Sequence, residues 1–141
     1  MTTNLSIVIQ PIEEDGFHII STITINHQPA VVIIDTGASK SVFDENRIEK
    51  FVNHHDFKKQ DKLSSGLGTN TMESKSVHID ALQLNDLEIK GYNATLLNLE
   101  HVNASYQKLD LLPIDGIIGG DILTAHHAVI DYRKKTITLT K

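Results

Sequence analysis

The 141-residue sequence contains no cysteine. Disulfide bonds, thiolate zinc sites and a cysteine nucleophile are therefore excluded. Basic residues are in the minority, because 13 Lys and Arg stand against 18 Asp and Glu, and the net charge is −5. Phosphate binding requires clustered basic side chains, so this balance argues against nucleic acid as the main partner.

Long apolar runs are also missing. No run approaches the roughly 20 residues of a membrane-spanning helix, so no membrane partner is expected. The first residues, Met1-Thr2-Thr3-Asn4, lack the basic and apolar regions of a signal peptide, and we expect a cytoplasmic location by default. No low-complexity linker divides the chain, whose length is typical of a single domain over residues 1–141.

Short stretches of β-forming residues dominate the chain. Apolar and polar residues alternate over residues 17–25, as in a half-buried strand. Residues 30–34 are apolar at every position, which indicates a central strand buried on both faces. Further strands are expected at residues 5–10, 77–84, 87–89, 92–99, 128–132 and 136–140. The pattern predicts a mainly β fold, either a barrel or a sandwich.

Helical signals are few. Asp44 is a reasonable N-cap for a short helix over residues 44–53. A second short helix is expected over residues 121–126, a loop over residues 100–112, and a polar hairpin over residues 58–75.

The segment Asp35-Thr36-Gly37-Ala38-Ser39 directly follows the apolar run. An ionised carboxylate there costs several kcal/mol unless it is paired, hydrogen-bonded or protonated. Taken alone, the segment would more often be a simple turn. Two further features favour a functional site. The run Ile117-Ile118-Gly119 repeats the pattern of strand, small residue and short helix, and a glycine-bearing hairpin over residues 65–71 lies between the two elements.

In order and spacing these elements resemble the retropepsin-like aspartic peptidases, specifically the single-domain bacterial type with Asp-Thr-Gly-Ala-Ser. The resemblance covers residues 17–139. It implies an acid-protease β-barrel with a flap hairpin and one or two short helices. It further implies that Asp35 is the catalytic carboxylate, that the Thr36 hydroxyl braces the active loops across a dimer, and that Gly37 lets the backbone approach the carboxylates. Residues expected to contact substrate are Ala38, Ser39, Gly66, Leu67, Gly68, Thr69 and Ile118.

In this chemistry one carboxylate acts as general base toward a water molecule and another as general acid toward the carbonyl oxygen. Neither a metal nor another cofactor is required. The sequence has a single Asp-Thr-Gly, and Ile117-Ile118-Gly119 supplies no second one. The second carboxylate must therefore be Asp35 of another subunit, which predicts a homodimer with a two-fold axis between the two side chains. Residues 5–10 and 136–140 are the segments that the resemblance favours for an intersubunit sheet.

Three other interpretations remain open. A phosphate-binding loop of the actin-like type also follows a strand with Asp-x-Gly, but that fold needs two large lobes. A binding or assembly module with the retropepsin fold and little peptidase activity is the main alternative to an endopeptidase acting on peptides or proteins. The eight histidines include the adjacent pairs His54-His55 and His126-His127. Adjacent side chains point in different directions, so these pairs favour solvated or packed histidines over a metal site.

Overall fold

The computed structural model describes residues 1–53, 57–64 and 72–141. Within these residues the chain forms eleven strands, two α-helices and one 3₁₀ turn. The strands are β1 (Thr2–Ser6), β2 (Val8–Ile12), β3 (Gly16–Ile25), β4 (Gln28–Ile34), β5 (Val42–Asp44), β6 (Phe57–Ser64), β7 (Met72–Leu84), β8 (Leu87–Leu97), β9 (Gly116–Ile118), β10 (Val129–Asp131) and β11 (Thr136–Thr140). The helical elements are η1 (Ile48–Lys50), α1 (Glu100–Lys108) and α2 (Gly120–Ala125). The fold is mainly β, as the sequence predicts.

Six strands close into a barrel in the order β3-β4-β9-β5-β8-β7. The ring closes where β7 returns to β3, with Thr24 opposite Gln83 and Ile25 opposite Leu82. Strand β4 is confirmed as a central strand. It pairs antiparallel with β3 and parallel with β9, and its apolar side chains are covered on both faces. Closure leaves these strands without free edges over the paired stretch.

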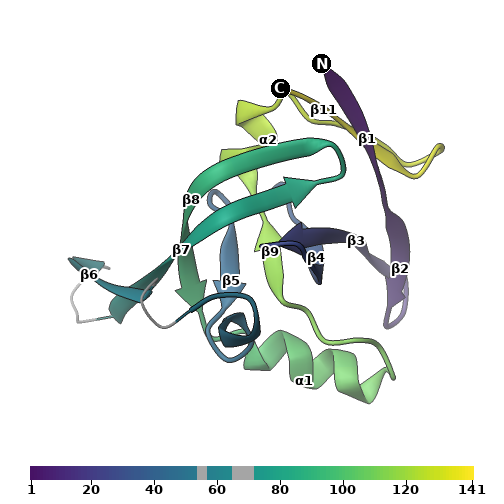
Figure 1. Cartoon of the computed structure of the whole chain (residues 1–141). Helices are drawn as coiled ribbons and strands as arrows, with labels where there is room; N and C mark the ends of the chain where they lie inside the picture. The colour runs from purple at the N-terminus through teal and green to yellow at the C-terminus, as the bar shows by residue number, and fades with distance from the viewer. Residues whose placement is uncertain (54–56, 65–71) are drawn as a thin grey trace.

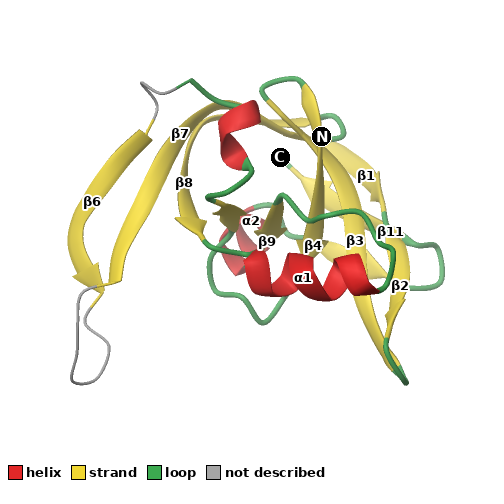
Figure 2. Cartoon of the chain, turned by 90° about the horizontal axis from the view of Figure 1, so that it is seen from below, coloured by secondary structure: helices red, strands yellow, loops and turns green. Residues whose placement is uncertain are grey.

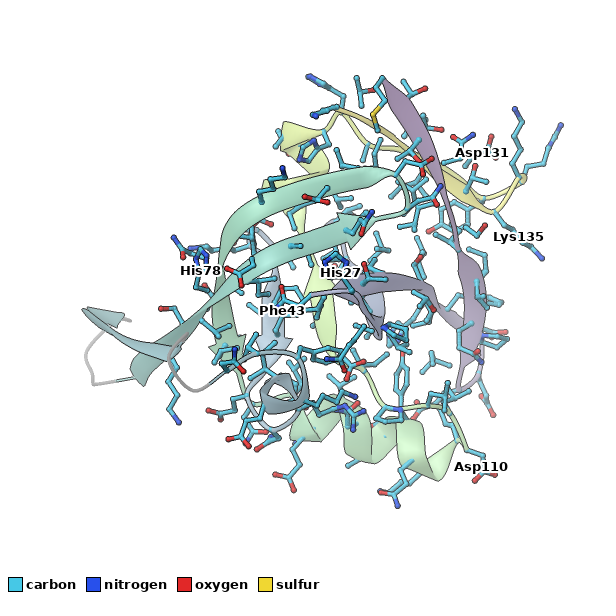
Figure 3. All side chains as sticks on the ribbon, viewed as in Figure 1. His27, Phe43, His78, Asp110, Asp131 and Lys135 are labelled. Atoms are coloured by element: carbon cyan, nitrogen blue, oxygen red, sulfur yellow. The ribbon has the colours of Figure 1, made fainter. Side chains whose placement is uncertain are left out.

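The core fills this barrel. Phe43 of β5 is fully buried and lies near the middle of the molecule (Figure 3). The alternating apolar residues of β3, including Ile19, Ile23 and Ile25, point into the same cluster. A second, smaller cluster joins Ile33 of β4 to Tyr106 of α1 and to Ile114. Helix α1 therefore packs against the outside of the barrel, along the lower side of the molecule in Figure 1 and in front of it in Figure 2.

The chain ends form a separate three-stranded sheet in the order β1-β11-β10, and the two termini lie close together (Figure 1). The predicted hairpin between β10 and β11 is confirmed. Within the single chain, β11 pairs with β1 on one side and with β10 on the other, and pairing of residues 136–140 with another subunit stays a prediction. The expected strand over residues 5–10 is broken at Ile7, where the chain passes from the terminal sheet to β2 beside the barrel.

Two predictions about helices are wrong. Residues 100–112 contain α1 instead of forming only a loop, because Val102 and Tyr106 lie one turn apart and pack on the barrel. Residues 44–53 form only the single turn η1. Asp44 ends β5 with 1% of its surface exposed, and its carboxylate accepts hydrogen bonds from Asn46 N, Leu99 N and Asn103 Nδ2. Tertiary partners thus take the place of the expected helix cap.

The helix expected over residues 121–126 is confirmed within one residue as α2. Strands β6 and β7 pair as an antiparallel hairpin that extends away from the barrel (Figures 1 and 2). The strands expected at 87–89 and 92–99 are one continuous strand, β8. In the described part of the chain no helix combines the length and the apolar character needed to cross a membrane.

Candidate active site

Asp35 begins the loop that follows β4. Its backbone N–H donates to Ile118 O at 2.9 Å, and Ala38 N donates to Asp35 O at 3.2 Å, so the loop is a tight turn fixed to β9. Gly37 N donates to Asp35 Oδ1 at 2.9 Å. A Cβ atom on Gly37 would lie 3.3 Å from the same carboxylate oxygen. Glycine therefore allows the backbone to approach the carboxylate, as the sequence predicts.

The second glycine element lies directly beneath this loop. Gly120 N donates to Ala38 O at 2.7 Å. A Cβ atom on Gly119 would lie 2.6 Å from Ala38 O and 3.0 Å from the Lys40 carbonyl. Because both neighbours are backbone atoms, neither could move aside without displacing the loop. The close approach of the two loops thus requires glycine at position 119.

A partly buried hydrogen-bond network ties the two loops together. Ser41 N and Ser41 Oγ donate to Asp121 Oδ1 at 2.8 and 2.7 Å, and Tyr92 Oη donates to Asp121 Oδ2 at 2.7 Å. Ser41 Oγ in turn accepts a hydrogen bond from Gly119 N at 2.8 Å. Burial by itself would raise the pKa of Asp121, but the hydrogen bonds from Ser41 and Tyr92 outweigh it and lower that pKa below its usual range. Burial and the neighbouring Asp121 raise the pKa of Tyr92, so its hydroxyl remains a donor.

Asp35 and Thr36 lie in an open pocket of about 580 Å³. The pocket walls are mostly apolar and come from several elements: Phe17, His18 and Ile19 of β3, Ile33 and Ile34 of β4, Ile117 of β9, Val102 of α1, and Ile130 and Tyr132 at β10. The side chains of Asp35 and Thr36 are exposed in the single chain. The arrangement places a carboxylate in a cleft with mostly apolar walls.

A second pocket of about 580 Å³ lies between β1 and β3. It is lined by aliphatic side chains together with neutral polar ones, among them Ser21, Gln83 and Asn85. None of its lining residues is acidic, basic or a histidine, so it offers no general acid or base. The Asp35 pocket is therefore the better candidate for chemistry.

Half of the predicted site residues lie on one loop. Ala38 and Ser39 lie on the same loop as Asp35, Thr36 and Gly37. The prediction that Ile118 contacts substrate is wrong, because Ile118 is 0% exposed and its side chain belongs to the core. Its neighbour Ile117 points the other way and lines the pocket, since successive side chains of a strand face opposite sides. The predicted flap residues Gly66, Leu67, Gly68 and Thr69 lie outside the described residues.

Sequence reasoning missed the residues that α1 and β3 contribute to the pocket. The position of His18 follows from the β3–β4 register, which ends with Ile19 paired to Ile34. No sequence signal marked Val102 or Tyr106 for the site, because their positions depend on how α1 packs against the barrel. Over the described ranges, no three His, Asp or Glu side chains gather where they could hold a metal ion.

Residues 21–122 match the family model described as aspartyl protease, which is more than two thirds of the chain. The chain belongs to the aspartyl protease family. No curated protein sequence matches it. Among solved structures, the chain is similar to a retropepsin-like aspartic protease from Rickettsia conorii, with 13% identity, a TM-score of 0.60, and coverage of 99% of this chain and 90% of the other.

Two further structures are similar. One is the retroviral protease-like domain of Ddi1 from Leishmania major, with 18% identity, a TM-score of 0.52, and coverage of 85% of this chain and 86% of the other. The other is the EIAV protease in complex with the inhibitor HBY-793, with 21% identity, a TM-score of 0.52, and coverage of 84% and 93%. At these identities the similarity shows a shared retropepsin-like fold.

Proposed function

We propose that the chain is an aspartic endopeptidase whose active site is completed by Asp35 of a second copy. The observation that carries this proposal is the Asp35 loop: a carboxylate at the exposed end of a buried strand, held by Gly37 N and lying in an apolar cleft. The aspartyl protease family and the retropepsin-like fold support it.

The proposed mechanism uses only the two Asp35 side chains and a water molecule. Two carboxyl groups roughly 3 Å apart cannot both be ionised, so the two Asp35 side chains share one proton. The ionised Asp35 removes a proton from the water as it attacks the scissile carbonyl carbon, and the protonated Asp35 donates to the carbonyl oxygen. The Asp35 that took the water proton then donates it to the amide nitrogen as the C–N bond breaks. The other Asp35 takes back a proton from a hydroxyl of the tetrahedral intermediate, and the carboxylic acid and amine products leave. The chain needs no metal or other cofactor for these steps.

A single chain offers only half of this machinery. The sequence contains one Asp-Thr-Gly, and the carboxylate of Asp35 is exposed on its own. In the proposed homodimer the two-fold axis passes between the Asp35 side chains, and the Thr36 hydroxyls brace the two loops. The hairpin of β6 and β7 is the proposed flap over the bound peptide or protein.

Mixing wild type with Asp35→Asn tests the proposal. Turnover of a peptide library first identifies substrates of the wild-type protein. With a nine-fold excess of Asp35→Asn and free exchange, only about one tenth of wild-type chains pair with another wild-type chain. Activity per wild-type chain should fall to about that fraction.

The matched control is Asp110→Asn, which removes the same charge at the exposed C-terminal end of α1 (Figure 3). Excess Asp110→Asn should not lower the activity. Undiminished activity in the presence of Asp35→Asn would show that one chain suffices. A complete lack of turnover by wild type, with the dimer present, would favour the binding or assembly module.

A further inference from the structure

His18 lies on β3, near the Asp35 loop that follows β4. The antiparallel register of β3 and β4 ends with Ile19 across from Ile34, and His18 and Asp35 are the residues next to this last pair. Cross-strand neighbours project to the same face of a sheet. Both side chains accordingly line the same pocket, together with the aliphatic side chains of Val102 and Ile117.

Helix α1 fixes the orientation of the His18 ring. Its Tyr106 hydroxyl lies 2.6 Å from His18 Nδ1, and the two rings stack with their centroids 5.8 Å apart and an interplanar angle of 20°. Tyr106 is itself 2% exposed and packs on Ile33 and Ile114. The imidazole is thus held from one side by a rigid aromatic neighbour.

The hydrogen-bond inventory decides which His18 nitrogen carries the proton. Burial raises the pKa of Tyr106 to about 12, so its hydroxyl keeps its hydrogen at neutral pH. Among the described residues that hydroxyl has no partner other than His18 Nδ1. If Nδ1 carried the proton, the Tyr106 hydrogen would be buried without an acceptor, which is costly. Neutral His18 therefore accepts at Nδ1 and carries its hydrogen on Nε2.

His18 Nε2 remains available for another molecule. Within the described part of the chain it has no hydrogen-bond partner, and no buried polar side-chain atom lacks one, so Nε2 is open to solvent. Protonation of the ring would leave Nε2 a donor as well. The lining of the cleft therefore includes one imidazole with an unpaired Nε2 within the described residues, beside Thr36, Tyr132 and mostly apolar side chains.

We propose that His18, oriented by Tyr106, is a specificity-determining residue that selects peptide substrates with an acceptor side chain, a carboxylate or a carboxamide, close to the scissile bond. The inference rests on the proposed peptidase function and names its substrate class. A site built around a hydrogen bond discriminates strongly against a substrate that lacks it, because its own polar group is then left unpaired.

The substrate test uses one cleaved peptide and three versions of it at each position flanking the scissile bond. Gln and Glu supply a neutral and a charged acceptor, and Met supplies similar length without a strong acceptor. At one position, kcat/KM for the Gln or Glu peptide should exceed that for the Met peptide about ten-fold, which corresponds to about 1.4 kcal/mol. Comparison of Gln with Glu shows whether charge contributes.

Two variants separate a structural role of His18 from the proposed one. In His18→Asn the amide oxygen can take the place of Nδ1 and accept from the Tyr106 hydroxyl, so this contact is kept and the donor at Nε2 is lost. In His18→Gln the amide nitrogen reaches the place of Nε2. We expect the ratio of kcat/KM between the Gln and Met peptides to fall to about one in His18→Asn, and to stay above one in His18→Gln. Tyr106→Phe should weaken the preference, because Nδ1 loses its partner.

Three results would overturn the inference: no acceptor preference in wild type, an unchanged preference in His18→Asn, or a loss of turnover in His18→Asn that is equal for all three peptides. Thermal unfolding and sedimentation of each variant confirm a folded dimer before the ratios are compared. Failure of the proposed function is a different outcome, because wild type would then cleave none of the peptides.

Discussion

Two carboxylates beside the paired strands β4 and β9 lie in opposite environments. Asp35, after β4, is exposed and accepts a hydrogen bond from Gly37 N. Asp115, at the start of β9, has 4% of its side chain exposed and contacts Arg47 Nε at 2.7 Å, Lys50 Nζ at 3.1 Å and Val31 N at 2.9 Å. The same functional group can hold the fold together where its oxygens are all occupied, and can act on substrate only where they are free.

Asp35→Asn should produce the largest functional effect. General acid–base catalysis typically contributes 10²–10⁴-fold, so we expect kcat/KM to fall about a thousand-fold. Because the side chain is exposed, the free energy of unfolding should change by less than about 0.5 kcal/mol. Peptide turnover and urea unfolding measure the two effects. A large fall in the free energy of unfolding would contradict the contrast between an exposed Asp35 and a structural Asp115.

Gly119→Ala should be the most destabilising change in the two loops. Its new Cβ would meet backbone on both sides, at 2.6 and 3.0 Å, and overpacking of this kind costs about 3 kcal/mol. Gly37→Ala is the matched control. There the new Cβ would meet only a carboxylate oxygen at 3.3 Å, which can shift, so the cost should stay below about 1 kcal/mol. An equal fall in the free energy of unfolding of the two variants, measured with urea, would show that both positions accept a Cβ atom equally well.

Asp115→Asn should lower the free energy of unfolding by about 2 kcal/mol, because two charge-assisted hydrogen bonds lose their charge. The loss is smaller than for a fully buried ion pair, since Arg47 and Lys50 are partly exposed and can be solvated. Asp110→Asn, at an exposed position, should leave the stability unchanged. Activity of the folded Asp115→Asn dimer should stay within a few-fold of wild type. A thousand-fold loss would place Asp115 in the chemistry.

The smallest expected effect is the pH dependence of stability due to Asp121. Its folded-state pKa is lowered, so the unfolded chain binds the proton more readily. The stabilisation is therefore present above the ordinary value of about 3.9 and is lost as the pH falls through the lowered value. Urea unfolding from pH 6 to pH 3 should show a shallower acid loss in Asp121→Asn than in wild type. Parallel curves would show that other carboxyl groups dominate.

Local residue chemistry was enough to predict strands β3 and β4. Five consecutive apolar residues before Asp35 required a strand buried on both faces, and β4 is such a strand. The alternation over residues 17–25 likewise predicted β3. Helix α1 could not be predicted in this way, because only Val102 and Tyr106 make it amphipathic and their contacts lie on distant parts of the chain. The sequence predicted Asp44 as a helix cap, because the hydrogen bonds that Leu99 and Asn103 donate to its carboxylate form only in the folded chain.

The sequence by itself determined the chemistry available to this protein: one Asp-Thr-Gly, no thiol and two glycine-containing turns, each set by the intrinsic properties of a few adjacent residues. Tertiary structure alone decided which side chains share the cleft with Asp35. It placed Ile117 at the pocket and Ile118 in the core. It also brought His18 into hydrogen-bond contact with Tyr106, 88 residues away. Such pairings follow from register and barrel closure, which depend on the packing of the whole chain rather than on any local pattern.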